Sequence, residues 1–138
     1  MFISKYSVED WQGNRNHGSA RPAQTWDEIE TAIRSLDEHH KTPVTLETED
    51  ETHLAVGGGQ GKYLVYLTFD NEKFHYLSDS SKQDEQENLV VGGQSGLYPA
   101  KYCVTLTTAL KAAKTFVEFG VMEATLHWKG EEAFELVS

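Results

Sequence analysis

The stretch that decides the fold is LVVGGQSGLYPAKYCVTLTTALKAAKTFVEFGVMEATLHW, residues 89–128. It holds a helical segment that Thr107 can cap at its start and that Gly120, suited to the left-handed conformation, ends. Apolar residues mark the buried face of this helix at helical spacing, namely Ala109, Leu110, Ala113, Phe116 and Val117. A strand is expected to follow over Ala124–Trp128. No catalytic constellation accompanies these elements, so we expect a scaffold whose function lies on its surface.

A second helix is predicted upstream, where Thr25-Trp26-Asp27-Glu28 has the form of a capping box. Its apolar positions follow at i, i+3, i+7 and i+10, namely Trp26, Ile29, Ile33 and Leu36. We expect this helix to end near His39-His40, before Pro43. Two adjacent histidines point about 100° apart on a helix, which favours a role at the helix dipole or in solvent over a metal site.

Antiparallel strands are predicted for much of the remaining chain, namely over Phe2–Val8, Val44–Thr48, His53–Gly57, Tyr63–Phe69 and Phe74–Leu77. Side chains alternate within residues 62–69, with Tyr63, Val65 and Leu67 on one face and Leu64 and Tyr66 on the other. Both faces are bulky, which is typical of a central strand. The predicted fold class is therefore α+β, with an antiparallel β-sheet of about five to seven strands and two main helices packed on it. Residues 1–138 are expected to form a single domain.

The chain is acidic, with a formal net charge of -10 from 22 acidic and 12 basic residues. A field of this sign repels nucleic acid and anionic lipid and favours basic partners, although acidity also serves solubility alone. No signal peptide or membrane-length apolar run is evident, so we expect a cytoplasmic protein that binds neither nucleic acid nor a membrane directly. The single cysteine, Cys103, sits between Tyr102 and Val104 and is expected to be an inert buried thiol.

Two polar segments offer candidate residues for binding a partner. Residues 9–24 are predicted to form a long loop, in which Trp11 is either an exposed anchor or part of the core. Residues 78–88 are predicted to form a second, solvated loop. Together with the turn near residue 50, this loop supplies the densest negative charge, carried by Glu47, Glu49, Asp50, Glu51, Asp79, Asp84, Glu85 and Glu87. These residues are suited to steering a basic protein, with loop solubility as the alternative explanation.

The residues that could support catalysis or small-molecule binding form no established motif. Gly57–Gly61 lacks the Lys-Ser or Lys-Thr pair and the following helix of a phosphate loop, so a hairpin connection is favoured, and Gly92–Gly96 is read as a bulge or turn. His53, His75 and His127 lie on predicted strands, where convergence on one face would make a general base or metal site. Half-buried, hydrogen-bonded histidines are the alternative. A small-molecule binding module would need a pocket under the strand that carries Tyr63 and Tyr66.

The order of these features resembles the Imm1-type immunity proteins of bacterial polymorphic toxin systems. The resemblance covers about residues 25–128 and rests on the first capped helix with Trp26, Val56-Gly57-Gly58-Gly59, Val90-Val91-Gly92-Gly93, Phe116 to Gly120, and Leu126-His127-Trp128. In that family the final turn often reads Gly-x-Pro, whereas Gly120-Val121-Met122 lacks the proline.

The resemblance implies a small α+β protein that is encoded beside a secreted toxin and blocks the toxin domain inside the producing cell. Such toxins are commonly nucleases or nucleic-acid deaminases, whose basic grooves an acidic inhibitor can occupy as a phosphate mimic. The resemblance also implies a binding protein rather than an enzyme, without a cofactor or metal. The acidic residues named above, with Trp11, are then candidates for contact with the toxin's C-terminal domain.

Overall fold

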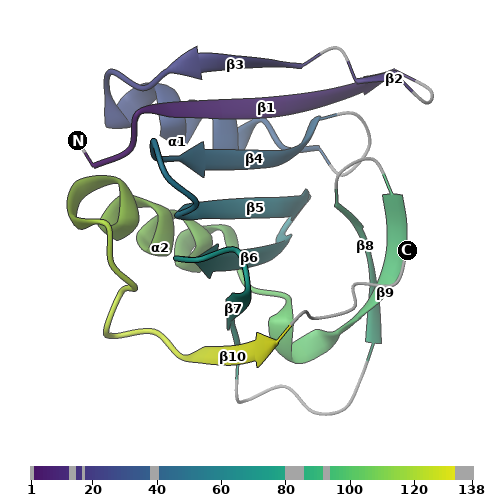
Figure 1. Ribbon diagram of the computed structural model, residues 1–138. Coiled ribbons are helices and arrows are strands. Elements are labelled where there is room, and N and C mark those ends of the chain that lie inside the picture. Colours follow the sequence, from purple (N-terminus) through teal and green to yellow (C-terminus); the bar gives the residue numbers. More distant parts are fainter. Residues whose placement is uncertain are drawn as a thin grey trace.

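An antiparallel sheet carries two helices on one face and a separate hairpin on the other (Figure 1). The computed structural model describes residues 2–12, 15–16, 18–37, 41–79, 86–91 and 94–132. The strands are β1 (Lys5–Gln12), β2 (Arg15–Asn16), β3 (Ser19–Pro22), β4 (Lys41–Glu47), β5 (His53–Gly59), β6 (Lys62–Thr68), β7 (Lys73–Leu77), β8 (Gln86–Val91), β9 (Gln94–Pro99) and β10 (Trp128–Glu132). The helices are α1 (Trp26–Arg34), the short 3-10 turn η1 (Ala100–Tyr102) and α2 (Leu106–Phe119). The predicted α+β class is confirmed.

The main sheet is eight-stranded, in the order β10-β7-β6-β5-β4-β1-β2, with β3 also paired to β1. β6 is an interior strand with the predicted alternation. Tyr63, Val65 and Leu67 point into the core beneath the helices, whereas Leu64 and Tyr66 pack on the opposite face. Strand β8 contacts β5, β4 and β6, so it crosses the face that the helices leave free. The predicted loop over residues 78–88 was therefore wrong at its end, since Gln86 already belongs to β8.

Helix α1 begins as the sequence predicts. The Thr25 hydroxyl accepts a hydrogen bond from the Glu28 amide at 3.3 Å, and the Glu28 carboxylate accepts one from the Gln24 amide at 3.1 Å. The helix ends at Arg34 rather than near residue 40, because the Ser35 hydroxyl bonds back to the Ala32 carbonyl at 2.6 Å. His39-His40 lies outside the described residues, and Pro43 lies within β4.

Helix α2 buries the predicted face, and its N-cap is Thr105 rather than Thr107. The Thr105 hydroxyl accepts a hydrogen bond from the Thr108 amide. The preceding residue, Val104, forms an isolated β-bridge with Tyr63 of the sheet. Gly120 ends the helix with φ 71°, as expected for a left-handed cap.

The expected loop over residues 9–24 is instead a second antiparallel arm of the sheet. β2 and β3 follow β1 in one continuous register, with Trp11 opposite Asn16 and Val8 opposite Ser19. Glycine is needed at position 18 for the close approach of the two strands, because a Cβ at this position would collide with the Val8 carbonyl. A polar edge hairpin resembles a loop in sequence because few of its side chains enter the core.

The closing strand also begins later than predicted, at Trp128 rather than at residue 124. The Glu123 carboxylate accepts hydrogen bonds from both the amide and the hydroxyl of Thr125, which holds residues 123–125 in a local turn. A hairpin joins β5 to β6, as predicted, but Gly57, Gly58 and Gly59 belong to β5, so the connection consists of Gln60 and Gly61 rather than of residues 57–61. β8 and β9 pair from Gln86 opposite Pro99 to Val91 opposite Gln94. The bulge or turn predicted over Gly92–Gly96 was therefore wrong for residues 94–96, which belong to β9, and Gly92 and Gly93 lie outside the described residues.

Candidate protein-binding surface

Two acidic turns meet at one end of the main sheet. Residues 48–52 join β4 to β5, and residues 69–72 join β6 to β7. The sheet brings them together because His53, at the start of β5, pairs with Thr68, at the end of β6. The Thr52 hydroxyl also donates a hydrogen bond to the Phe69 carbonyl at 3.2 Å. We call this region the acidic end; its carboxylates belong to Glu47, Glu49, Asp50, Glu51, Asp70 and Glu72.

The carboxylates of the acidic end differ in whether they accept hydrogen bonds from the protein itself. Asp50 Oδ1 accepts hydrogen bonds from the Thr48 hydroxyl and the Thr52 amide, which lower the pKa of Asp50. The backbone amides of Lys73 and Glu72 lower the pKa of Asp70 in the same way. Both aspartates therefore stabilise their turns.

Glu49 and Glu51 are exposed, and their carboxylates make no hydrogen bond or ion pair with other described residues. These two glutamates are thus available to a cation from outside. Their charge is held on the 48–52 turn, which Asp50 stabilises.

Large apolar side chains are exposed at this same end of the molecule. They are Phe119 with 67% of its surface exposed, Val121 with 49%, Phe2 with 47% and Phe69 with 42%. The Phe2 amide donates to the Val117 carbonyl at 2.7 Å, which brings the start of the chain to the C-terminal end of α2. The C-terminal end of α2, the start of β1 and the two acidic turns lie on the same side of the molecule in Figure 1.

The other sequence-predicted binding residues are not described at this end. Asp79 follows the far end of β7, where its amide bonds to the Lys101 carbonyl. Asp84 and Glu85 lie outside the described residues, and the structure describes only the backbone of Glu87 on β8 and of Trp11 on β1.

Sequence reasoning did not name the four exposed apolar residues or the acids of the 69–72 turn as candidates for binding a partner. Phe119 carried one usable signal, because it falls outside the apolar stripe of α2. Phe69 carried none, because it continues the alternation of a core strand into a turn.

The three strand histidines do not converge. His53 lies on the outer face of the sheet, where its Nδ1 donates to the Glu51 carbonyl at 3.0 Å and its Nε2 is 3.4 Å from the Tyr66 hydroxyl. His75 pairs with Leu67 and so lies on the helix face, where burial and then Lys73 lower its pKa. His127 is exposed before β10. The register thus gives these histidines no common site for acid–base chemistry.

Tyr66 lies at the centre of an aromatic cluster on the outer face. Its ring packs edge-on against His53 and Phe74, at centroid distances of 5.6 and 5.3 Å. Burial, followed by the charges of Glu9 and Glu47, raises the pKa of Tyr66. This tyrosine therefore remains protonated and acts in packing, rather than opening a pocket under β6.

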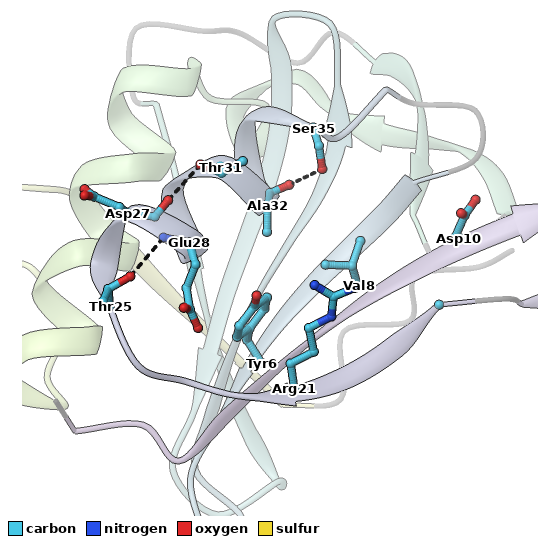
Figure 2. Close-up of a pocket in the computed structure, with 11 residues that line it drawn as sticks. Tyr6, Val8, Asp10, Arg21, Thr25, Asp27, Glu28, Thr31, Ala32 and Ser35 are labelled. Carbon is cyan, nitrogen blue, oxygen red and sulfur yellow. Dashed lines mark hydrogen bonds between the residues drawn. The ribbon is translucent and has the colours of Figure 1, made fainter.

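A groove of about 730 Å³ lies elsewhere, between helix α1 and strands β1 and β3. Tyr6, Val8 and Ala32 supply its apolar surface, while Arg21 and Glu28 supply charge. Figure 2 shows the Tyr6 hydroxyl, the Arg21 guanidinium and the Glu28 carboxylate reaching into the space between helix and strands. A small-molecule binding module would need a pocket under the strand that carries Tyr63 and Tyr66, whereas this groove lies at the edge of the sheet.

Within the described ranges, no three His, Cys, Asp or Glu side chains are placed to hold a metal ion together. Cys103 is buried, as predicted. Neither α1 nor α2 has the length and apolar character needed to cross a membrane.

Comparison with known proteins matches residues 17–130 to the family described as immunity protein Imm1, whereas no curated protein matches the chain. The match spans most of the main sheet and both helices. Immunity proteins are generally not enzymes, which agrees with the scattered histidines. The chain belongs to the Imm1 family of immunity proteins.

Proposed function

We propose that this protein neutralises a cognate toxin C-terminal domain by forming a stoichiometric complex through its acidic end. The observation that carries the proposal is the exposure of Phe2, Phe69, Phe119 and Val121 on the side of the molecule that also holds the two acidic turns. Protein interfaces are typically built from aromatic and apolar contacts at the centre and charged residues at the rim. Membership of an immunity protein family supplies the class of partner.

The charge of the acidic end supports a basic toxin domain as the partner. Glu49 and Glu51 are exposed and held on a rigid turn, so they can meet lysine or arginine side chains with little loss of conformational freedom. A nuclease or nucleic-acid deaminase binds phosphates and therefore presents such side chains. We propose a toxin of this class, whose basic groove the acidic end covers or borders.

The remaining sequence-predicted candidates keep a secondary place in this proposal. Asp79, Asp84, Glu85, Glu87 and Trp11 would contact the toxin only if the interface extended beyond the acidic end. The described backbone gives no reason to group them with the two turns.

The test is a titration of the purified protein with the C-terminal domain encoded by the adjacent upstream gene, at low and at high salt. We expect tight stoichiometric binding, loss of toxin activity in proportion to the complex formed, and weaker binding at high salt. Reversing charge with Glu49→Lys and Glu51→Lys should weaken binding and flatten the salt dependence. Asp79→Lys, at the other end of β7, makes the charge change of each single glutamate variant, so Glu49→Lys and Glu51→Lys are each compared with it. An unchanged affinity in the double glutamate variant would remove the acidic end from the interface.

A further inference from the structure

The groove beside α1 contains a buried polar group that the fold does not use. Tyr6 has only 6% of its surface exposed, and its ring belongs to the main core. Its hydroxyl forms no hydrogen bond with another described residue, and Figure 2 shows it facing the groove. Buried hydroxyls normally have a partner. The Tyr63 hydroxyl also makes no hydrogen bond with a described residue, but only Tyr6 of these two lines the groove, which gives a ligand, or a water that a ligand displaces, access to its hydroxyl.

Two charged side chains flank this hydroxyl without neutralising each other. Arg21 and Glu28 form no ion pair with each other. Arg21 is exposed, and its guanidinium makes no hydrogen bond within the described part of the chain. Glu28 uses one carboxylate oxygen for the Gln24 amide. The groove therefore offers donors from Arg21 and Tyr6 on one side and an acceptor from Glu28 on the other.

A peptide group has the matching chemistry, because it carries one N–H donor and one C=O acceptor on opposite sides. Its carbonyl would accept from Arg21 and from the Tyr6 hydroxyl, and its N–H would donate to Glu28. The volume of about 730 Å³ lies within the range of ligand pockets and admits a short extended segment.

The strand next to the groove also favours a peptide. Within the described residues, β3 pairs only with β1, which leaves its other edge without a strand neighbour. Main-chain groups along an open edge can pair with an incoming extended chain. A small ligand would leave this edge unused, whereas a peptide segment can satisfy both the edge and the groove.

The groove begins close to the acidic end. The Ala23 amide donates to the Ser4 carbonyl at 3.1 Å, and the Ser4 amide donates to the Glu47 carbonyl at 2.9 Å. Thr25, at the mouth of the groove, is thus only a few residues from the surface that we assign to the toxin. One protein partner can cover both regions.

We propose that the α1–β3 groove, lined by Tyr6, Arg21 and Glu28, receives an extended peptide segment of the toxin domain. This inference rests on the proposed function, since it assumes that the toxin binds. It adds a second point of contact that recognises main-chain amide groups rather than positive charge.

The experiment uses Tyr6→Phe, which removes the hydroxyl and keeps the ring. Tyr63→Phe is the matched control, because Tyr63 is 4% exposed, its hydroxyl also makes no hydrogen bond with described residues, and it does not line the groove. We expect Tyr6→Phe to weaken toxin binding about three- to tenfold, the range for loss of one hydrogen bond. The melting temperature of the free protein should not fall, because no internal hydrogen bond is lost. Tyr63→Phe should leave affinity unchanged.

A second arm uses Arg21→Gln, with Lys111→Gln on the exposed surface of α2 as a charge-matched control. Amide hydrogen exchange in the complex should show protection of β3 and of the first turn of α1. Equal affinities for wild type, Tyr6→Phe and Arg21→Gln, without protection of β3, would overturn the groove proposal while leaving the toxin complex intact. Absence of any binding by the wild-type protein would instead overturn the proposed function.

A third arm measures the melting temperature of the free protein with free amino acids and dipeptides. Stabilisation by these compounds that Tyr6→Phe abolishes, with no effect of Tyr6→Phe on toxin binding, would reassign the groove to a small zwitterion. That outcome also overturns the proposal. No stabilisation, together with the expected loss of toxin affinity, supports it.

Discussion

Thr115 Oγ1 donates a 2.8 Å hydrogen bond to Oε1 of Glu123, which lies beyond the end of α2. The other carboxylate oxygen accepts from Thr125, and the Glu123 carbonyl accepts from the Trp128 indole at 3.1 Å. One glutamate therefore links the last turns of α2 to the first residue of β10. This link positions the connection that runs from the exposed Val121 to the edge of the sheet.

The Glu123 link predicts acid sensitivity. Hydrogen bonds from the Thr125 hydroxyl and amide, then from Thr115, lower the pKa of Glu123 from 4.5 to about 2. Because the pKa is lower in the folded state, the stabilisation is complete above about pH 4.5 and is lost as the pH falls toward about 2. We expect the free energy of unfolding to decline across this window and Glu123→Gln to flatten part of the decline. Urea denaturation followed by tryptophan fluorescence at several pH values measures it.

Asp50 and Asp70 act in the same direction, because their pKa values are also lowered in the fold. Some pH dependence will therefore persist in Glu123→Gln. Glu118→Gln makes the same chemical change at an exposed position of α2 and is the control. A flattening of equal size in Glu118→Gln would show that the slope comes from net charge and not from the Thr115–Glu123 link.

Much of the fold could be predicted because its signals are local. The capping box at Thr25, the left-handed Gly120 and the alternation through Tyr63 each depend on a few neighbouring residues. The strands β2 and β3 at the edge of the sheet were missed because main-chain pairing with β1 holds them. Such pairing does not require apolar side chains, so a polar sequence gave no signal of a strand. The start of β10 was missed because the Glu123 carboxylate competes for backbone amides that a strand would use.

The site was less predictable than the fold. The Glu49 turn could be named from its charge, but its proximity to Phe69 depends on strand order, which no local pattern contains. Tyr6 reads in sequence as an ordinary core residue of an alternating strand. Only the packing of α1 beside β3 shows that its hydroxyl faces an open groove.

Two phenylalanines of α2 should separate stability from binding. Phe116 is fully buried and touches Phe2 edge-on, at 5.9 Å between ring centroids, so Phe116→Ala should cost about 3–5 kcal/mol of stability. Phe119 is 67% exposed, so Phe119→Ala should change stability by less than about 0.5 kcal/mol. Urea denaturation measures both. In toxin titrations we expect Phe119→Ala to weaken binding, and an unchanged affinity would place Phe119 outside the interface.

Gly120 should tolerate alanine poorly for two reasons. Its φ of 71° strains any residue with a Cβ, which costs about 1–2 kcal/mol. A Cβ would also collide with the Phe2 ring. Gly61→Ala isolates the first effect, because Gly61 has φ 91° and open space around its Cβ position. We expect Gly120→Ala to destabilise the protein more than Gly61→Ala does, as measured by thermal denaturation. Adding Phe2→Ala to Gly120→Ala should remove the additional destabilisation, because the ring that the Cβ meets is then absent. Equal losses of stability in Gly120→Ala and Gly61→Ala would exclude the collision.

Asp50 and Glu51 are neighbours with different expected roles. Asp50 Oδ1 holds the Thr48 hydroxyl at 2.6 Å and the Thr52 amide at 2.8 Å, so Asp50→Ala should lower the melting temperature. The Glu51 carboxylate is exposed and unengaged among the described residues, so Glu51→Ala should leave the melting temperature unchanged. At low salt Glu51→Ala should weaken toxin binding about two- to fivefold, the effect of one rim charge, and this difference should vanish at high salt. Isothermal titration calorimetry at two salt concentrations measures the binding. A difference in toxin affinity between wild type and Glu51→Ala that persists at high salt would mean that Glu51 contributes through shape or hydrogen bonding rather than through its charge.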